Sequence, residues 1–128
     1  MLEEKGELPL GIEKDGVVHR KYTLREQLVG DAVDVFDSED GVRAGRSDEF
    51  FGVCITARKL SVEGIPQEDI TTALVMGMRQ TDFNELAAAD KRLEEKRRTF
   101  RGAAKAAAEA PDSAAKAGGP LQGDSVNA

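Results

Sequence analysis

The segment 14–36 constrains the fold more than any other part of the chain, because it combines a turn, a strand and a helix start. It reads KDGVVHRKYTLREQLVGDAVDVF. Thr23 and Glu26 have the spacing of a capping box, in which the Thr23 hydroxyl accepts from the amide of Glu26 and the Glu26 carboxylate accepts from the amide of Thr23. The spacing predicts a helix over 24–36. Its expected inner face is Leu24, Leu28, Ala32, Val35 and Phe36.

A strand before this segment completes a β-hairpin. Leu8, Leu10 and Ile12 alternate at the strand period of two, and Pro9 makes their strand an edge strand. A three-residue loop over 14–16, with Gly16 at positive φ, would keep the apolar side chains on one face. It pairs Ile12 with Val18, Leu10 with Arg20 and Leu8 with Tyr22. A two-residue Asp15-Gly16 turn would instead pair Ile12 with His19 and Leu10 with Lys21, so the longer loop is favoured.

Three further helices are expected after a solvated loop over 37–46. Ser47 is a good N-cap for a core helix over about 48–60, and Pro66 begins a short helix that ends near Met78. The longest helix should run from Thr81 to about Arg101. The predicted fold is therefore small α+β: mainly α, with an N-terminal β-hairpin and about four helices. We expect a flexible segment 1–7, one domain over 8–102, and an Ala/Gly-rich, mostly disordered tail over 103–128.

Composition narrows the class of protein. The chain has 128 residues, a formal net charge of −6 and one cysteine, so no intrachain disulfide can form and a reducing cytoplasm is the default. No apolar run approaches membrane-spanning length, and the acidic N-terminus does not resemble a signal peptide. We expect a soluble protein without a membrane segment.

Catalytic and metal-binding patterns are weak. His19 is the only histidine and is expected on an exposed strand, while Cys54 is expected inside the core helix as a small apolar residue. The carboxylate clusters lack the ligand spacing of a calcium loop, and no phosphate-binding glycine loop is present. We predict no enzyme activity, no cofactor and no metal site.

The most basic segment lies near the end of the fourth helix. It contains Lys91, Arg92, Lys96, Arg97, Arg98 and Arg101. Glu94 and Glu95 lie within it, and no aromatic platform accompanies it, so a solvated helix face is favoured over a nucleic-acid surface. A small nucleic-acid-associated regulatory protein that uses this helix end is kept as the alternative function.

An apolar seam on the fourth helix is the candidate partner-binding site. Phe83, Leu86, Leu93 and Phe100 recur at spacings of three and seven. We expect the seam to extend past the end of a small core beyond about Asp90. Leu93 and Phe100 would then be free to contact a partner or a second copy of the chain.

A family resemblance adds to these expectations. Its residues are Gly16, then Tyr22, Thr23, Leu24, Arg25 and Glu26, then Gly30 and Asp31, followed by Ile65-Pro66, Thr81-Asp82 and Leu86. Together they resemble the tail assembly chaperones of long-tailed phages, of the Mu-like and P2 E-like type. The resemblance covers about residues 8–86.

The resemblance implies a non-catalytic protein of the host cytoplasm that is absent from the mature virion. Its implied partner is the tape measure protein, a long, aggregation-prone helical chain that such a chaperone holds ready for tail-tube polymerisation. A longer form made by ribosomal frameshifting is also implied.

Overall fold

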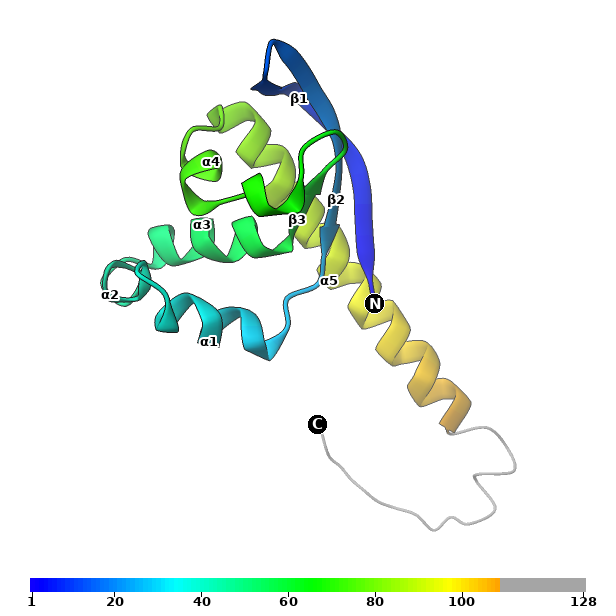
Figure 1. Cartoon of the computed structure of the whole chain (residues 1–128). Coiled ribbons are helices and arrows are strands. Elements are labelled where there is room, and N and C mark those ends of the chain that lie inside the picture. Colours follow the sequence, from blue (N-terminus) through cyan, green and yellow to red (C-terminus); the bar gives the residue numbers. More distant parts are fainter. Residues whose placement is uncertain (109–128) are drawn as a thin grey trace. The chain divides into compact units, whose positions relative to one another are not determined.

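The computed structural model describes residues 1–108 (Figure 1). Its elements are β1 (Glu3–Lys14), β2 (Val17–Arg25), α1 (Val29–Asp37), α2 (Gly41–Ala44), α3 (Asp48–Lys59), β3 (Leu60–Val62), a 3₁₀ turn (Gln67–Asp69), α4 (Thr72–Met76) and α5 (Gln80–Ala108). The predicted small α+β class with an N-terminal hairpin is confirmed. Within the predicted tail, residues 103–108 continue α5, and residues 109–128 lie outside the described part.

The chain divides into residues 1–94 and the part that begins at Glu95. The boundary therefore falls inside α5 rather than near Gly102. Residues 3–7, which we expected to be flexible, are paired strand: Glu3 lies opposite Arg25 and Glu7 opposite Lys21. The amide of Glu26 donates to the carbonyl of Leu2 at 3.0 Å, so hydrogen bonding extends almost to the chain start.

The hairpin uses the two-residue turn that we had disfavoured. Asp15 and Gly16 both have positive φ, 54° and 78°, as a tight hairpin turn of the Asp-Gly kind requires. Ile12 consequently lies opposite His19, not Val18. The twist of the short turn matches that of the strands, which is why it forms in place of the longer loop.

A bulge in β1 corrects the apolar pattern that this turn would otherwise disturb. The register shifts between Glu7 and Ile12, so that residues 8–11 face Arg20 alone. Gly11 allows the bend with a φ of 96°. Leu8 and Ile12 are then both buried, 0% and 9% exposed.

The buried carboxylate of Asp82 holds this bulge in place. Its Oδ1 accepts from the amide of Leu10 at 2.8 Å and its Oδ2 from the amide of Gly11 at 2.9 Å. Asp82 is fully buried in the first turn of α5. A bulged strand has unpaired amides, and here a side chain far along the chain satisfies two of them.

The first helix begins five positions later than predicted, and the predicted Thr23–Glu26 capping box is wrong. Thr23 lies in β2, between Lys5 and Ser61 on the neighbouring strands. The helix begins after Leu28, whose amide donates to Asp31 Oδ2 at 2.7 Å. Sheet pairing on both sides of β2 outweighs the local helix-start signal, because a central strand gains two ladders of hydrogen bonds.

The core helix α3 is confirmed, with the Ser47 hydroxyl accepting from the amide of Phe50 at 3.1 Å. Directly after it comes β3, which the sequence reading missed and which pairs with β2. The main core lies between the sheet, α3 and α5. Its buried residues are Leu8, Ile12, Tyr22, Leu24, Ala57, Leu60, Val62, Ile65, Ile70, Val75, Leu86, Ala89 and Leu93.

Two further predicted segments differ in detail from the observed elements. The expected loop over 37–46 contains α2, and its Gly41 and Ala44 are buried. The expected single helix from Pro66 is instead a 3₁₀ turn followed by α4, which Thr71 caps by accepting from the amide of Leu74 at 3.2 Å. In Figure 1, α3 lies between α4 on one side and α1 on the other.

Candidate partner-binding surface

The structure divides the predicted seam on α5. Leu86 and Leu93 are buried, 2% and 1% exposed, and Phe83 packs partly buried against the same core. Asp90, which interrupts the seam, pairs with Lys59 of α3 at 2.7 Å. The expectation that Leu93 is left to meet a partner is therefore wrong, because the β-sheet extends the core along α5. Phe100 is 66% exposed, in the part that begins at Glu95.

The residues that carry the resemblance, called the signature below, include Tyr22, which joins the sheet to α5. The Tyr22 hydroxyl donates to Glu85 Oε2 at 2.5 Å, and Arg92 donates to the same carboxylate at 3.1 Å. Arg92 Nε also donates to Glu4 Oε2 on β1 at 2.7 Å. Burial and the Glu85 carboxylate raise the pKa of Tyr22, and the Tyr22 hydrogen bond lowers the pKa of Glu85. These residues connect β1 and β2 to α5.

A second part of the signature fixes α1 against the end of β2. Both terminal guanidinium nitrogens of Arg25 donate to the Asp31 carboxylate, at 2.9 and 2.8 Å, and Arg25 also donates to the carbonyl of Arg58 at 2.9 Å. Asp31 is 6% exposed. The Arg25 hydrogen bonds lower the pKa of Asp31 despite its burial. Arg25 and Asp31 therefore have a structural role, because they fix the start of α1 to the end of β2 and to α3.

The remaining signature residues either pack in the core, form backbone contacts or lie exposed without a close neighbour. Leu24 is buried in the core, and Glu26 accepts from the amide of Leu2 at 3.3 Å. Gly30 is exposed, and a Cβ there would touch nothing, so the expected close approach of a neighbouring backbone at Gly30 is wrong. Gly16 serves the hairpin turn. The motif thus explains folding and supplies no exposed reactive group.

An accessible apolar surface of unit 1–94 is the outer side of α1, which we call the α1 outer face. It consists of Val29, Val33 and Phe36, with exposed fractions of 87%, 52% and 50%. The three side chains are spaced i, i+4 and i+7, which places them along one side of a helix. Leu28 before the helix and Val42 after it are also exposed. Phe36 is the member of the face that contacts another helix, since its ring stacks on Phe51 of α3.

Sequence reasoning missed this face because it placed the helix start too early. With Leu24 as the first helical residue, Leu28, Ala32, Val35 and Phe36 formed the natural inner face. The inner side is instead set by Asp31 and Val35, which the Arg25 pair turns toward α3. The spacing of Val29 and Val33 was the available signal, since these apolar residues did not fit the predicted inner face. Phe36 was placed on that inner face but is 50% exposed.

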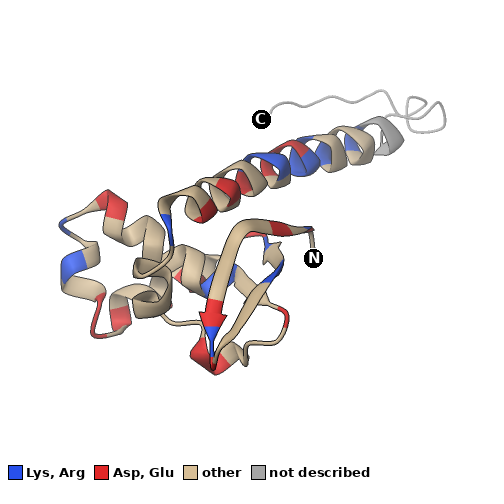
Figure 2. Cartoon of the chain, turned by 90° about the horizontal axis from the view of Figure 1, so that it is seen from above, with Lys and Arg blue, Asp and Glu red and all other residues tan. Residues whose placement is uncertain are grey.

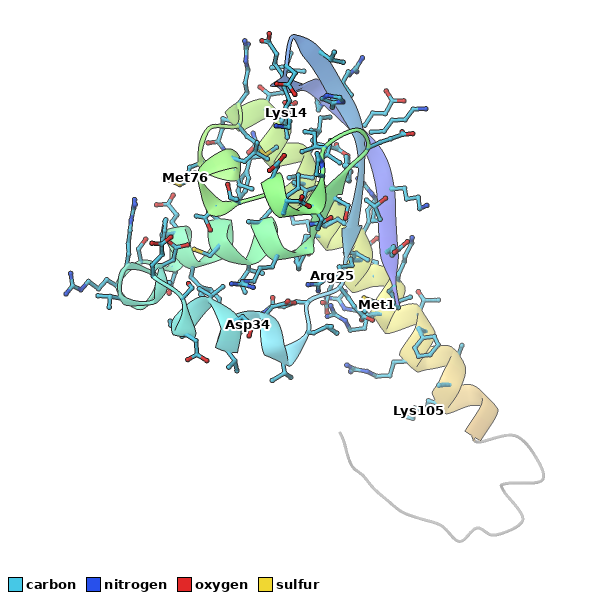
Figure 3. The ribbon with its side chains drawn as sticks, viewed as in Figure 1. Met1, Lys14, Arg25, Asp34, Met76 and Lys105 are labelled. Atoms are coloured by element: carbon cyan, nitrogen blue, oxygen red, sulfur yellow. The ribbon has the colours of Figure 1, made fainter. Side chains whose placement is uncertain are left out.

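Acidic residues surround the α1 outer face. The segment from Leu28 to Val42 contains no Lys or Arg; its acids are Asp31, Asp34, Asp37, Glu39 and Asp40. Asp31 forms an ion pair with Arg25. Asp34 stays mostly exposed and lies 3.8 Å from Arg58. Asp34 is labelled on α1 in Figure 3, near Arg25, and both line a hollow of about 400 Å³.

A second hollow, of about 320 Å³, lies between α3, α4 and the start of α5. Phe83 lines it together with Phe50, Val53 and Met76, and Arg43 lies over the Phe50 ring at 4.0 Å. Of the four predicted partner-binding residues, Phe83 and Phe100 are thus the ones that keep accessible surface, and they lie at different sites on the helix.

Residues considered for chemistry lie apart from one another. Cys54 is buried in α3, where burial raises the pKa of its thiol. His19 lies on β2 against Gly64. Within residues 1–108, no group of three His, Cys, Asp or Glu side chains could hold a metal ion. No helix in the same range is long and apolar enough to cross a membrane.

The basic segment of α5 is only partly available as a surface. Figure 2 shows α5 with acidic positions in its first half and basic positions toward its C-terminal end. Arg92 belongs to the Tyr22–Glu85 network described above. Arg101 and Lys105 are exposed.

Compared with protein-family models, curated proteins and solved structures, the chain shows no significant match.

Proposed function

We propose that this chain is a non-catalytic tail assembly chaperone that binds a tape measure protein and keeps it soluble until the tail tube polymerises. The α1 outer face carries the proposal, because Val29, Val33 and Phe36 expose a helical apolar stripe on a folded unit. A contiguous exposed apolar stripe is typical of a protein-binding surface. The resemblance at residues 16–31 and 65–86 supplies the kind of client.

A small apolar face suits a holding function. Three partly exposed side chains offer limited contact area, which favours weak, reversible binding over a permanent complex. The client must leave the chaperone when the tube forms, so reversibility is needed. We place this activity in the host cytoplasm, with the chaperone absent from the mature virion and a frameshifted longer form as a further partner.

Co-expression tests the proposal. A co-expressed tape measure protein should be found in the soluble fraction with the native chain and in the pellet without it. Val33→Asp should return it to the pellet, because a charge in the stripe opposes apolar docking. Val18→Asp is the matched control, since Val18 is 55% exposed and Val33 52% exposed, on different elements.

Two results would contradict the proposal. One is a client whose solubility does not depend on this chain. The other is an equal effect of Val33→Asp and Val18→Asp while both variants remain folded by circular dichroism.

The alternative function, nucleic-acid binding, has one favouring observation. Basic residues recur at the end of α5, namely Lys96, Arg97, Arg98, Arg101 and Lys105. Binding to DNA or RNA that weakens steeply with salt, and that Arg98→Glu with Arg101→Glu abolishes, would support this alternative.

A further inference from the structure

We propose that the α1 outer face binds a basic amphipathic helix, so that the client segment recognised under the proposed function carries lysines or arginines beside its apolar stripe. The statement rests on the proposed function for the identity of the client. The chemistry of the partner helix follows from three properties of the face itself: its shape, its rigidity and its charge.

The shape fits a helix. Val29, Val33 and Phe36 span two turns, about 10 Å along the axis at 1.5 Å per residue. A partner helix with apolar residues at i, i+4 and i+7 matches that length and spacing. A single extended peptide strand would need an open sheet edge, which a helix face does not offer.

The face is held rigidly and cannot turn inward. Rotating α1 to bury Val33 would expose Val35, which is 1% exposed, and would break the Arg25–Asp31 pair. The Phe36 ring also stacks on Phe51 of α3, with ring centroids 5.4 Å apart and planes at 17°. Gly41 packs so closely on the Phe36 carbonyl that a side chain there would collide with it. The stripe is therefore exposed as a consequence of the fold.

The acidic charge beside the α1 outer face determines that the partner helix should be positively charged. Asp37, Glu39 and Asp40 follow the stripe at the end of α1, and Asp34 lies on the same side of the helix as Asp37 by the helical period. Two nearby cations pair with acids of α1, Arg25 with Asp31 and Arg58 with Asp34 at 3.8 Å. Within residues 1–108, no ion pair engages the acids that follow the stripe, Asp37, Glu39 and Asp40. Acidic flanks attract a cationic helix and repel an anionic one.

The same charge argues against two other occupants. A second α1 outer face would bring two acidic borders together, which is unfavourable. A bilayer with anionic headgroups would repel this border, since helices that lie on such membranes have basic polar faces.

Two designed peptides test the proposal on the full chain. Both have about 20 residues and the same leucine stripe at i, i+4 and i+7, long enough to be helical when bound. One has lysines on both flanks and the other has glutamates. Fluorescence anisotropy should show at least about tenfold tighter binding of the lysine peptide at low salt, with the difference shrinking at high salt. Equal affinities, or no binding of either peptide, would overturn the proposal.

Variants assign the binding to this face. Val33→Asp should remove binding of the lysine peptide, while Val18→Asp should leave it unchanged. Asp37→Lys with Glu39→Lys should reduce or reverse the preference for the lysine peptide, because both residues are exposed and can change sign without affecting the core. Peptide binding that survives Val33→Asp would place the site elsewhere and overturn the proposal.

Other occupants give distinct results. Concentration-dependent dimers of the chain alone, lost on Val33→Asp, would assign the face to a second copy and overturn the proposal. Binding to anionic vesicles that Val33→Asp removes would assign it to a membrane and do the same. Lysine-peptide selectivity without solubilisation of the tape measure protein would support this inference while contradicting the proposed function, so the two failures are distinguishable.

Discussion

α1 and α5 pack on different apolar clusters and place their apolar residues in opposite ways. On α5, Leu86 and Leu93 are buried under the sheet, and Asp90 and Arg92 between them pair with other elements. On α1, the buried side contains an ion-paired aspartate, while Val29 and Val33 face outward. The most regular apolar spacing in this chain therefore marks the core, and the accessible binding surface lies on a short helix with an inverted pattern.

This difference has a physical origin in how each helix is attached. The first half of α5 gains its stability from apolar burial, with Asp82 and Glu85 adding hydrogen bonds to the sheet. α1 is attached by the Arg25–Asp31 pair, by Val35 and by the stacking of Phe36 on Phe51, which leaves Val29 and Val33 uncommitted.

Leu93→Ala should be the most destabilising change. Leu93 is 1% exposed in the main core, and a buried Leu→Ala substitution lowers the free energy of unfolding by about 2–5 kcal/mol. Phe100→Ala, at a 66% exposed position of the same helix, should change it by less than about 0.5 kcal/mol. Urea denaturation followed by circular dichroism measures both. Similar losses in the two variants would contradict the division of the seam.

Asp82→Ala should destabilise the chain through the bulge in β1. It leaves the amides of Leu10 and Gly11 without their acceptor, which costs about 1–3 kcal/mol. Hydrogen exchange should accelerate at these two amides before it does so at the amide of Tyr22. Unchanged protection at Leu10 and Gly11 would show that the bulge does not depend on Asp82.

Asp31→Asn should remove a pH-dependent contribution to stability. The pKa of Asp31 is lowered in the folded state, so its contribution is present above the unfolded pKa of about 4 and is lost as pH falls through the folded pKa. At neutral pH the variant should be about 1–3 kcal/mol less stable, because the Asp31 charge bonds to Arg25 and to the amide of Leu28.

The gap between Asp31→Asn and the native chain should narrow in acid, as measured by urea denaturation at a series of pH values. If the difference in the free energy of unfolding stayed constant down to a pH well below the pKa of an ordinary carboxyl group, the ionised Arg25–Asp31 pair would be contradicted.

Val33→Ala should have the smallest effect. Val33 is 52% exposed on α1, so the free energy of unfolding should stay within about 0.5 kcal/mol of the native value. Val35→Ala, the same substitution two positions along the same helix, should cost about 1–3 kcal/mol because Val35 is 1% exposed. Thermal unfolding compares the pair. Equal shifts would show that α1 does not have the inner side described here.

Parts of the fold were predictable from local patterns. The Ser47 cap and the apolar spacing after it identified α3, and long runs of helix-forming residues identified α5. The strand character around the Asp15-Gly16 turn was also clear, although its register was not. Such signals depend on neighbours in sequence, so they can be read without the tertiary structure.

The candidate site was not predictable in the same way. The Thr23–Glu26 spacing indicated a helix start, yet pairing of β2 with both β1 and β3 made Thr23 a strand residue. Leu93 was expected to be exposed because the third strand was missed and the core underestimated. Phe83 and Leu86 were placed correctly on one helix, but their burial depended on elements far away in sequence.

The sequence alone determined which segments form the hairpin and the two long helices, because turn residues, caps and apolar spacing act over a few neighbouring positions. Only the tertiary structure decided which side of each helix faces the core. That choice depended on contacts between distant residues, such as Asp82 with the β1 bulge and Arg25 with Asp31 and the carbonyl of Arg58. Long-range contacts of this kind left Val29, Val33 and Phe36 exposed on α1.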